Sequence, residues 1–394
     1  MNNAPAIPRG VWMLGFVSLL MDVSSEMIHS LLPLYLTASL GASALVVGFI
    51  EGVAEATALI VKVFSGALSD RLRSRKWITA AGYGMAALTK PLFAIATGPA
   101  LVFAARFIDR IGKGIRGAPR DALIADLTPA DARGAAFGLR QSLDTVGAFA
   151  GPLAAMGLML AWHDDFRAVF WVAVVPGLLS FALIAFAVRE PPRAAADAGK
   201  PPPRFDRATL RALGGAFWAV TTAGAALSLA RFSEAFLLLR WQDLGLETAL
   251  APLVLVAMNG VYALTAYPVG RLADRLPPGR LIAAGIACLI ASDVVLALAQ
   301  GLASLAAGIA LWGLHLGLTQ GVLAALVAHA SPPSLRGTAF GLFNVASGIA
   351  LLAASVVAGA LWQWAGPAAT FWAGAGLAAA SLFLVARRPG PAPG

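Results

Sequence analysis

Charge is scarce in this chain. Only 12% of its 394 residues are charged, whereas 59% are hydrophobic. An average soluble domain is about 25% charged, so this composition leaves too little polar surface to cover a soluble globule. The apolar residues also form long runs, among them residues 168–188 and 351–386. Because a run of ~20 apolar residues spans a ~30 Å hydrocarbon core, the sequence predicts an all-α membrane protein.

Cysteine and histidine are almost absent. Cys288 is the one cysteine, which excludes a disulfide within the chain and a paired-cysteine metal site. The four histidines have no metal-ligand spacing, and no nucleophile–base set or cofactor loop is visible. We therefore expect no enzyme, no metal and no cofactor. The short start "MNNAPAIPRG" leads into a full-length apolar segment, which indicates a retained first helix rather than a cleaved signal peptide.

Twelve segments are long enough to cross a membrane. One linker, residues 189–210, is rich in proline and charge, and it predicts an N-terminal bundle over 1–188 and a C-terminal bundle over 211–394. The twelve expected spans are 11–38, 44–69, 77–97, 99–119, 135–161, 168–188, 211–239, 249–270, 280–299, 302–328, 338–363 and 367–386.

The basic residues indicate the topology. Most of the 29 Lys and Arg residues fall in alternate connections, so the positive-inside rule predicts a multi-pass inner-membrane protein with both termini in the cytoplasm. This placement also accounts for the net charge of +9 without nucleic acid. The expected partners are the lipid bilayer and a small-molecule substrate, and we expect a monomer.

The two halves repeat. "SGALSDRL" at 65–72 matches "VGRLADRL" at 269–276, and "RGAAFGLRQ" at 133–141 matches "RGTAFGLFN" at 336–344. Two matches at nearly the same offset indicate duplicated six-helix halves. Such repeats around a site at the membrane midplane are typical of a rocking transporter.

The same segments carry a family resemblance. The loop "GALSDRLRSRK" at 66–76 resembles the signature of the major facilitator superfamily between spans two and three, with one extra residue and with Arg73 where glycine is usual. The expected fifth span resembles the antiporter signature of the exporter branch, although Ala155 and Met156 replace the paired glycines that usually follow. The resemblance implies the major facilitator fold, with twelve transmembrane helices in two pseudo-symmetric six-helix bundles, and transport by alternating access.

Two sets of residues follow from these motifs. A conformational latch is expected where a loop carboxylate caps a helix or pairs with an arginine at the inner face. A hinge or seal is expected where small residues allow close helix approach and a proline bends the span. The latch residues are Gly66, Asp70, Arg71, Asp274 and Arg275, and the hinge residues are Gly138, Gly147, Gly151 and Pro152.

Ionisable residues within spans are candidates for function by default. Acids one helical turn apart oppose each other's ionisation in a low dielectric, which suits a proton carrier. Static pairing with nearby cations is the alternative for each acid. The proton-coupling candidates are Asp22, Glu26, Glu51, Glu55 and Asp144, and the substrate or cavity candidates are Lys90, Arg106, Asp109, Arg110, Arg140, Arg231 and Glu234.

The densest charge lies in "RFIDRIGKGIRGAPRDALIAD", residues 106–126. It does not match a phosphate loop, because position 107 is Phe and position 114 is Gly. On a helix, six of its charged residues fall within about 120°, opposite Phe107 and Ile108. They are Arg106, Asp109, Arg110, Lys113, Arg116 and Arg120. We therefore expect a charged stripe facing the interior, with Pro119 ending or bending the helix.

These observations favour a secondary transporter that exports a small molecule in exchange for protons. Proton-driven uptake of a small organic anion on the same fold is the first alternative. A membrane receptor or assembly partner that transports nothing is the second. His29 and His315 fit either packed polar residues or proton relays, and Lys90 and Asp293 lie on spans that do not line the expected cavity.

Overall fold

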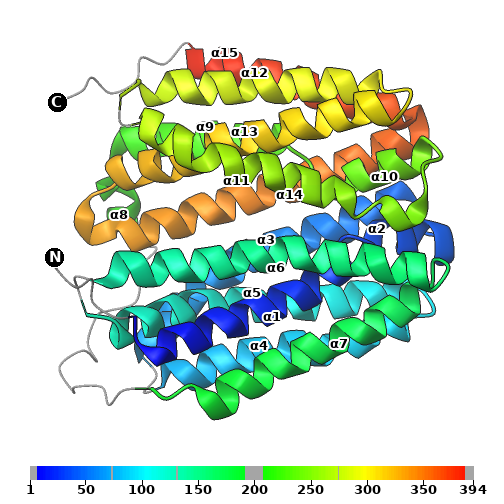
Figure 1. The fold of residues 1–394 in the computed structure, drawn as a ribbon. Coiled ribbons are helices and arrows are strands. Elements are labelled where there is room, and N and C mark those ends of the chain that lie inside the picture. The colour runs from blue at the N-terminus through cyan, green and yellow to red at the C-terminus, as the bar shows by residue number, and fades with distance from the viewer. Residues whose placement is uncertain (1–6, 72–73, 130–131, 191–206, 274, 387–394) are drawn as a thin grey trace, which may run out of the picture. The chain divides into compact units, whose positions relative to one another are not determined.

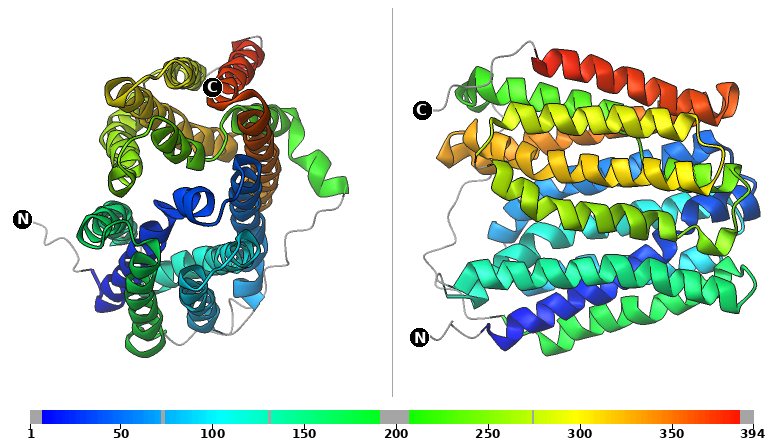
Figure 2. Two further views of the ribbon diagram at one scale, coloured as in Figure 1. Left: turned by 90° about the vertical axis from the view of Figure 1, so that its right-hand side faces the viewer. Right: turned by 45° about the horizontal axis from the view of Figure 1, so that its top comes forward.

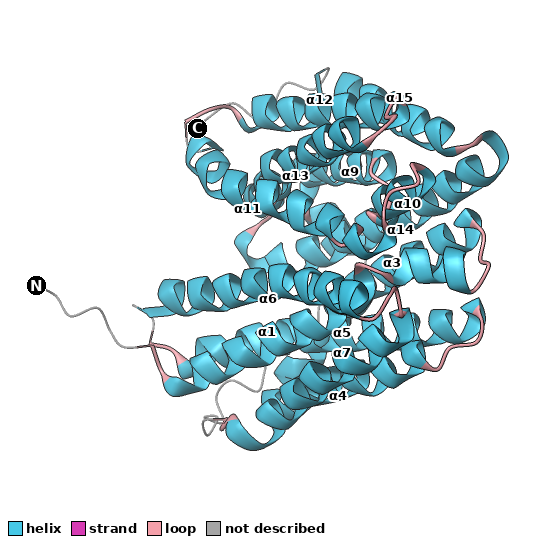
Figure 3. Ribbon diagram, turned by 45° about the vertical axis from the view of Figure 1, so that its right-hand side comes forward, coloured by secondary structure: helices cyan, strands magenta, loops and turns pink. Residues whose placement is uncertain are grey.

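The computed structural model describes residues 7–71, 74–129, 132–190, 207–273 and 275–386, and within these ranges it contains helices and no strands (Figures 1 and 3). The principal helices are α1 (Arg9–His29), α3 (Ala44–Arg71), α4 (Arg75–Ala94), α5 (Pro99–Leu127), α6 (Arg133–Ala161), α7 (Phe166–Ala182), α9 (Gly214–Ala230), α10 (Ala235–Asp243), α11 (Leu253–Ala273), α12 (Pro278–Ala297), α13 (Leu302–His329), α14 (Arg336–Ala365) and α15 (Pro367–Ala386).

These helices follow the expected spans closely. The first span continues beyond α1 through α2 (Leu32–Leu34) and a π-helical turn, η1 (Tyr35–Ser39). The sixth ends in a second π-helical turn, η3 (Leu183–Ala187), and a short helix, α8 (Arg207–Ala212), precedes the seventh. Short 3₁₀ turns, η5 (Thr248–Leu250) and η6 (Pro333–Leu335), precede α11 and α14. In the described part of the chain, nine helices are long and apolar enough to cross a membrane by composition alone.

The expected seventh span, 211–239, is not one helix. Its chain leaves the helical path between α9 and α10, over residues 231–234. The backbone N–H of Ser233 donates to the Ser355 hydroxyl at 3.2 Å, and the N–H of Ala235 donates to the Ser233 hydroxyl at 3.2 Å. These side-chain acceptors replace part of the lost helical ladder, so the break is stabilised at membrane depth.

Pro119 does not end α5, contrary to one of the sequence expectations, because the helix continues to Leu127. A proline within a helix removes one backbone donor, and packed neighbours in a membrane protein can compensate. The next residue, Arg120, donates to the Ser18 hydroxyl at 2.9 Å and to the Tyr83 hydroxyl at 3.5 Å. These contacts hold α5 against α1 and α4 directly after the proline.

The chain forms two compact units. The first contains residues 1–32 and 57–202, and the second contains residues 33–56 and 203–394. Helix α3 therefore begins in the second unit and ends in the first. Residues 33–56 group with the second half of the chain. The expected division into bundles at 188 and 211 stays a prediction.

The same helix pairs recur in both units. In the first unit α4 packs against α5 and α7, and α1 packs against α6 and α7. In the second, α12 packs against α13 and α15, and α9 packs against α14 and α15. Helices α12, α13 and α14 each begin 203 residues after α4, α5 and α6. The sequence repeat is therefore a structural repeat at this spacing.

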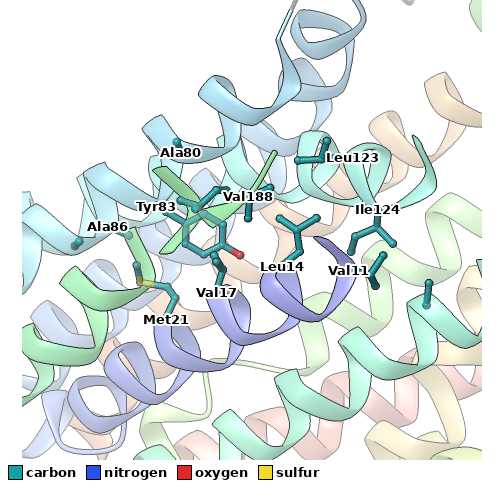
Figure 4. Close-up of a cluster of buried hydrophobic side chains, with 13 residues drawn as sticks. Val11, Leu14, Val17, Met21, Ala80, Tyr83, Ala86, Leu123, Ile124 and Val188 are labelled. Carbon is teal, nitrogen blue, oxygen red and sulfur yellow. The ribbon is translucent and has the colours of Figure 1, made fainter. Parts of the chain in front are cut away.

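Within each unit the helices run side by side (Figure 2). Apolar burial gives little drive for helix association in lipid, so close packing of small residues matters more. A Cβ added to Gly82 of α4 would lie 2.6 Å from the carbonyl oxygen of Gly112 on α5. The core beside this crossing contains Tyr83 (Figure 4). Its hydroxyl is hydrogen-bonded to the Ser18 hydroxyl at 3.0 Å.

The first half of α3 packs against α14 in the second unit. A Cβ on Gly48 would lie 2.2 Å from the carbonyl oxygen of Ser355, and one on Gly359 would lie 2.6 Å from that of Ala44. No side chain fits at either position without a shift of the backbone. This glycine contact explains why 33–56 group with the second half.

Candidate functional site

Helix α5 turns its charge inward. Arg106, Asp109 and Arg110 are 2–3% exposed, whereas Phe107 and Ile108 are 37% and 36% exposed. This is the orientation that the helical wheel predicts, with the polar stripe toward the other helices. Lys113, which the wheel places on the same stripe, is exposed.

Asp109 is at the centre of a buried ion cluster. The Lys90 ammonium donates to its carboxylate at 2.8 Å and to the Ser25 hydroxyl at 3.0 Å. The Arg110 Nε lies 3.8 Å from the other carboxylate oxygen, and Arg106 also interacts electrostatically with this acid. The side chains of Lys90 and Asp109 are 2% and 4% exposed. Breaking such a pair leaves an uncompensated buried charge, so this cluster is tightly fixed.

Asp22 and Glu26 are partnered more loosely. The Asp22 carboxylate lies 4.0 Å from the Arg116 guanidinium, and the Glu26 carboxylate lies 3.5 Å from Nδ1 of His29. Their side chains are 29% and 22% exposed, far more than Asp109. Asp22 also experiences the like charge of Asp144, which opposes simultaneous ionisation of the two acids.

Two of the predicted hinge glycines lie against these acids. A Cβ on Gly147 would lie 2.9 Å from Cβ of Asp22, and a Cβ on Gly151 would lie 2.7 Å from Cβ of Glu26. The backbone of α6 thus approaches α1 at the two residues that carry the acids. Gly138 has nothing within 4 Å of an added Cβ, so it is not part of this contact. Pro152 is buried inside α6, which continues to Ala161.

A second ionic network lies on α5 and α6. The Arg140 guanidinium bonds the Asp144 carboxylate at 2.9 Å and lies 3.8 Å from the Asp121 carboxylate. Asp121 in turn pairs with Arg120 at 3.2 Å. Arg116 stacks on the Tyr83 ring, with 4.7 Å between its Cζ and the ring centroid. The predicted pair of Arg140 and Asp144 is therefore part of a larger set.

The other predicted residues lie in the second unit. Glu51 is fully buried on α3 and Glu55 is half-buried one turn later. Arg231 and Glu234 occupy the break between α9 and α10, and Arg231 interacts electrostatically with Glu234 and Glu55. The structure therefore groups Asp22 and Glu26 with the cluster around Asp109, and groups Glu51 and Glu55 with Arg231.

The latch prediction falls mostly outside the described residues. Asp274 lies outside them, as do the side chains of Asp70 and Arg71 and the surroundings of Gly66. Arg275 is exposed. The latch stays a prediction.

The structure adds one contact that the sequence reasoning missed. Glu190 accepts hydrogen bonds from the Ser74 hydroxyl and from the backbone N–H groups of Arg75, at 2.7 Å, and Lys76, at 3.2 Å. Arg75 also pairs with Asp126 at 2.6 Å. The linker therefore begins by capping α4. Its signal in the sequence was an acid two residues after the sixth span, followed by two prolines.

The described residues contain no group of three or more His, Cys, Asp or Glu that could hold a metal ion.

Solved transporter structures share this fold. The nucleoside transporter NupG superposes with a TM-score of 0.76 at 14% identity, covering 96% of this chain and 99% of that one. The POT family transporter PepTSo superposes with a TM-score of 0.76 at 13% identity, covering 97% and 98%. At these identities the likeness establishes the fold alone.

Relatives in sequence are more informative. An MFS-type transporter of Methanocaldococcus jannaschii is 32% identical over 98% of this chain and 96% of its own length. The multidrug resistance protein MdtH of Photorhabdus laumondii is 31% identical over 162 residues, which are 41% of this chain and 39% of that protein. The family model of the Major Facilitator Superfamily matches residues 14–240 and 216–394. The fold, the repeat and these matches agree that the chain belongs to the major facilitator superfamily of transporters.

Proposed function

We propose that this transporter exports a small solute in exchange for protons, and that Asp22 and Glu26 carry those protons. One observation supports this choice above the others. Both acids are partly exposed, and their paired groups, the Arg116 guanidinium and Nδ1 of His29, lie at 4.0 and 3.5 Å. A proton carrier needs a carboxyl that water reaches and that no fixed ion pair keeps ionised.

Asp109 fits the opposite role. It is buried, and its hydrogen bond to Lys90 measures 2.8 Å. Protonating it would remove the counter-charge of at least one buried cation. We assign this acid to holding Lys90, Arg106 and Arg110 in place rather than to carrying protons.

The same cluster favours a solute with an anionic group. Lys90, Arg106 and Arg110 act on one carboxylate, Asp109, so the formal charge of these four residues is positive. Guanidinium groups bind carboxylates and phosphates through paired hydrogen bonds. This observation also favours the second candidate, proton-driven uptake of a small organic anion.

Export is preferred over uptake on two grounds. The glycines of the antiporter-like signature on α6, Gly147 and Gly151, lie directly against the proposed proton carriers. The partial relative MdtH is a multidrug resistance protein, a name that fits removal of solutes. A receptor that transports nothing gives no reason for partly exposed acids at membrane depth.

The test uses purified protein in liposomes that contain a pH-sensitive dye. Candidate organic anions and cations are first screened for thermal stabilisation of the protein, since a ligand of the folded state raises its stability. Each stabilising solute is then added with and without an imposed pH gradient. We expect solute movement against its own gradient in the wild type, with proton movement in the opposite direction.

Variants identify the carriers. Asp22→Asn or Glu26→Gln should abolish gradient-driven accumulation and leave exchange of labelled for unlabelled solute intact. Asp164→Asn is the matched control, because Asp164 is exposed in the turn between α6 and α7 at φ 64°, a conformation that Asn tolerates. If both carrier variants keep proton-driven accumulation, the assignment is wrong. Proton and solute movement in the same direction would favour uptake.

A further inference from the structure

Asp293 of α12 has a carboxyl group that is fully enclosed. The residue is 0% exposed, and neither of its side-chain oxygens has a hydrogen-bond partner in the described part of the protein. Burying an ionised carboxylate without donors or a cation costs several kcal/mol, more than burying the neutral acid. The enclosure therefore favours a protonated carboxyl in this packing.

Gly374 lies against this acid, and an aromatic cluster begins beside that glycine. A Cβ on Gly374 of α15 would lie 2.6 Å from an oxygen of Asp293 and 2.9 Å from the Phe232 ring. The Phe232 ring centroid is 5.4 Å from that of Trp312 and 5.6 Å from that of Phe371. Gly374 thus leaves the room that the carboxyl occupies, and the surrounding rings supply no charge.

The nearby cations have other partners. At the C-terminal end of α12, the Arg240 guanidinium donates to the carbonyl oxygens of Leu296 at 3.1 Å and Ala299 at 2.7 Å, and it pairs with Asp243. In the break before α10, Arg231 interacts with Glu234 and Glu55. No ion pair joins either arginine to Asp293 in the described structure.

The two helices beside α12 supply no counter-charge either. Helix α15, over Pro367–Ala386, has no ionisable side chain. On α13, Nδ1 of His315 lies 2.8 Å from the carbonyl oxygen of Gly285, and because a carbonyl only accepts, the ring nitrogen donates. Gly285 precedes Asp293 by eight residues, which is about 12 Å along a helix. His315 therefore does not pair with this acid.

The structural repeat shows what Asp293 replaces. At the spacing of 203 residues that relates α12 and α13 to α4 and α5, Asp293 corresponds to Lys90 and Trp312 corresponds to Asp109. The first half has a hydrogen-bonded ion pair there, at 2.8 Å. The second half instead has the carboxyl of Asp293, which can accept a hydrogen bond, and the indole N–H of Trp312, which can donate one. Like the carboxyl, the indole N–H is buried without a partner in the described residues.

Two unsatisfied groups at one equivalent site are costly. Each buried unmade hydrogen bond costs about 1–3 kcal/mol, and such groups in native structures call for an explanation. A bond between the Trp312 indole and the Asp293 carboxylate would satisfy both. It is not formed in this packing, and forming it would require a second arrangement of α12, α13 and α15.

We propose that Asp293 is a proton-binding site of the second half, separate from the acids of α1. Its carboxyl holds a proton in the packing seen here. When α12, α13 and α15 rearrange, the acid gives that proton to water, and the indole N–H of Trp312 donates to the carboxylate that remains. The inference rests on the proposed proton coupling and adds a second titrating group to it.

Infrared difference spectroscopy of the purified protein tests the first step without any solute. The spectrum of the wild type minus that of Asp293→Asn should show the C=O stretch of one protonated carboxyl at neutral pH. This band should shift to lower frequency after exchange into heavy water. Asp293→Leu, which fits an apolar surround, gives the same comparison if the Asn variant does not fold. A carboxylate band in its place would overturn the proposal. So would loss of the carbonyl band when sodium replaces potassium, which would indicate a cation site.

Two glycines of α15 provide a matched control. Gly374→Ala places a methyl group against the acid and should shift the carbonyl band. Gly376→Ala, where nothing lies within 4 Å of the added Cβ, should leave it unchanged. Equal effects of the two changes would contradict the enclosure of Asp293 by α15.

Transport tests the second step. Asp293→Asn should keep solute exchange and lose accumulation driven by a pH gradient. If infrared spectroscopy shows a protonated Asp293 but Asp293→Asn accumulates solute at the wild-type level, the acid is structural and the proposal is overturned. If Asp22→Asn and Glu26→Gln keep coupling while Asp293→Asn loses it, the assignment to α1 fails and the inference about Asp293 stands.

Discussion

Removing the acid of the buried cluster should cost more than removing its main cation. Asp109→Asn leaves Lys90, which is 2% exposed at its side chain, without its carboxylate at 2.8 Å. Breaking a buried pair from one side costs about 3–5 kcal/mol. Lys90→Met instead leaves Asp109 with Arg110 at 3.8 Å and with Arg106, so about 1–3 kcal/mol is expected.

The double variant makes the reasoning sharper. Once Asp109 is neutral, Lys90, Arg106 and Arg110 repel one another across a low dielectric. Adding Lys90→Met to Asp109→Asn should therefore restore part of the lost stability, on the order of 1–2 kcal/mol. The coupling energy of the double-mutant cycle measures the interaction between Lys90 and Asp109.

The assay is reversible unfolding in mixed micelles with increasing sodium dodecyl sulfate, followed by circular dichroism. Asp164→Asn, at an exposed turn, should unfold as the wild type does. A larger loss of stability in Lys90→Met than in Asp109→Asn would contradict a net positive cluster held by Asp109. So would a further loss when Lys90→Met is added to Asp109→Asn.

Two further predictions concern helix contacts. Gly151→Ala should destabilise the protein by about 1–3 kcal/mol, because the new Cβ would lie 2.7 Å from Cβ of Glu26. Gly138→Ala should be neutral or stabilising in the same unfolding assay. Equal losses of stability in the two variants would contradict the α1–α6 contact. Glu190→Gln should cost about 0.5–2 kcal/mol and speed amide hydrogen exchange in the first turn of α4. Asp165→Ala should speed exchange only in α7, where Asp165 accepts from the N–H of Ala168 at 3.1 Å. Unchanged exchange at α4 in Glu190→Gln would refute the cap.

Local periodicity was sufficient to predict much of this structure. The charged stripe of α5 could be predicted because charged and apolar residues alternate at the helical period. Its inward orientation follows once the helix lies in a membrane. The repeat was readable because "RGAAFGLRQ" and "RGTAFGLFN" stayed similar. Helix α14 begins 203 residues after α6, which is the spacing of these two motifs.

Contacts between distant segments could not be predicted from the sequence. The break at 231–234 contains neither glycine nor proline, and its hydrogen bond goes to Ser355, more than a hundred residues away. The glycines of α3 gave no sign that their partner is α14. Asp293 and Lys90 occupy equivalent positions, but their opposite charges hid the relation until the helix bounds were known.

The buried charge of α5 also bears on how the protein enters the membrane. Neither α4 nor α5 is among the helices apolar enough to span by composition. Inserting Arg106, Asp109 and Arg110 at mid-helix depth without partners would together cost about 8–10 kcal/mol on a translocon scale.

Helices α4 and α5 are consecutive and are joined by a short turn at 95–98, and the pair between Lys90 and Asp109 neutralises one charge on each. The two helices should therefore leave the translocon together as a hairpin. A chain truncated after α4 should be retained at the insertion channel, whereas one that includes α5 should reach the bilayer.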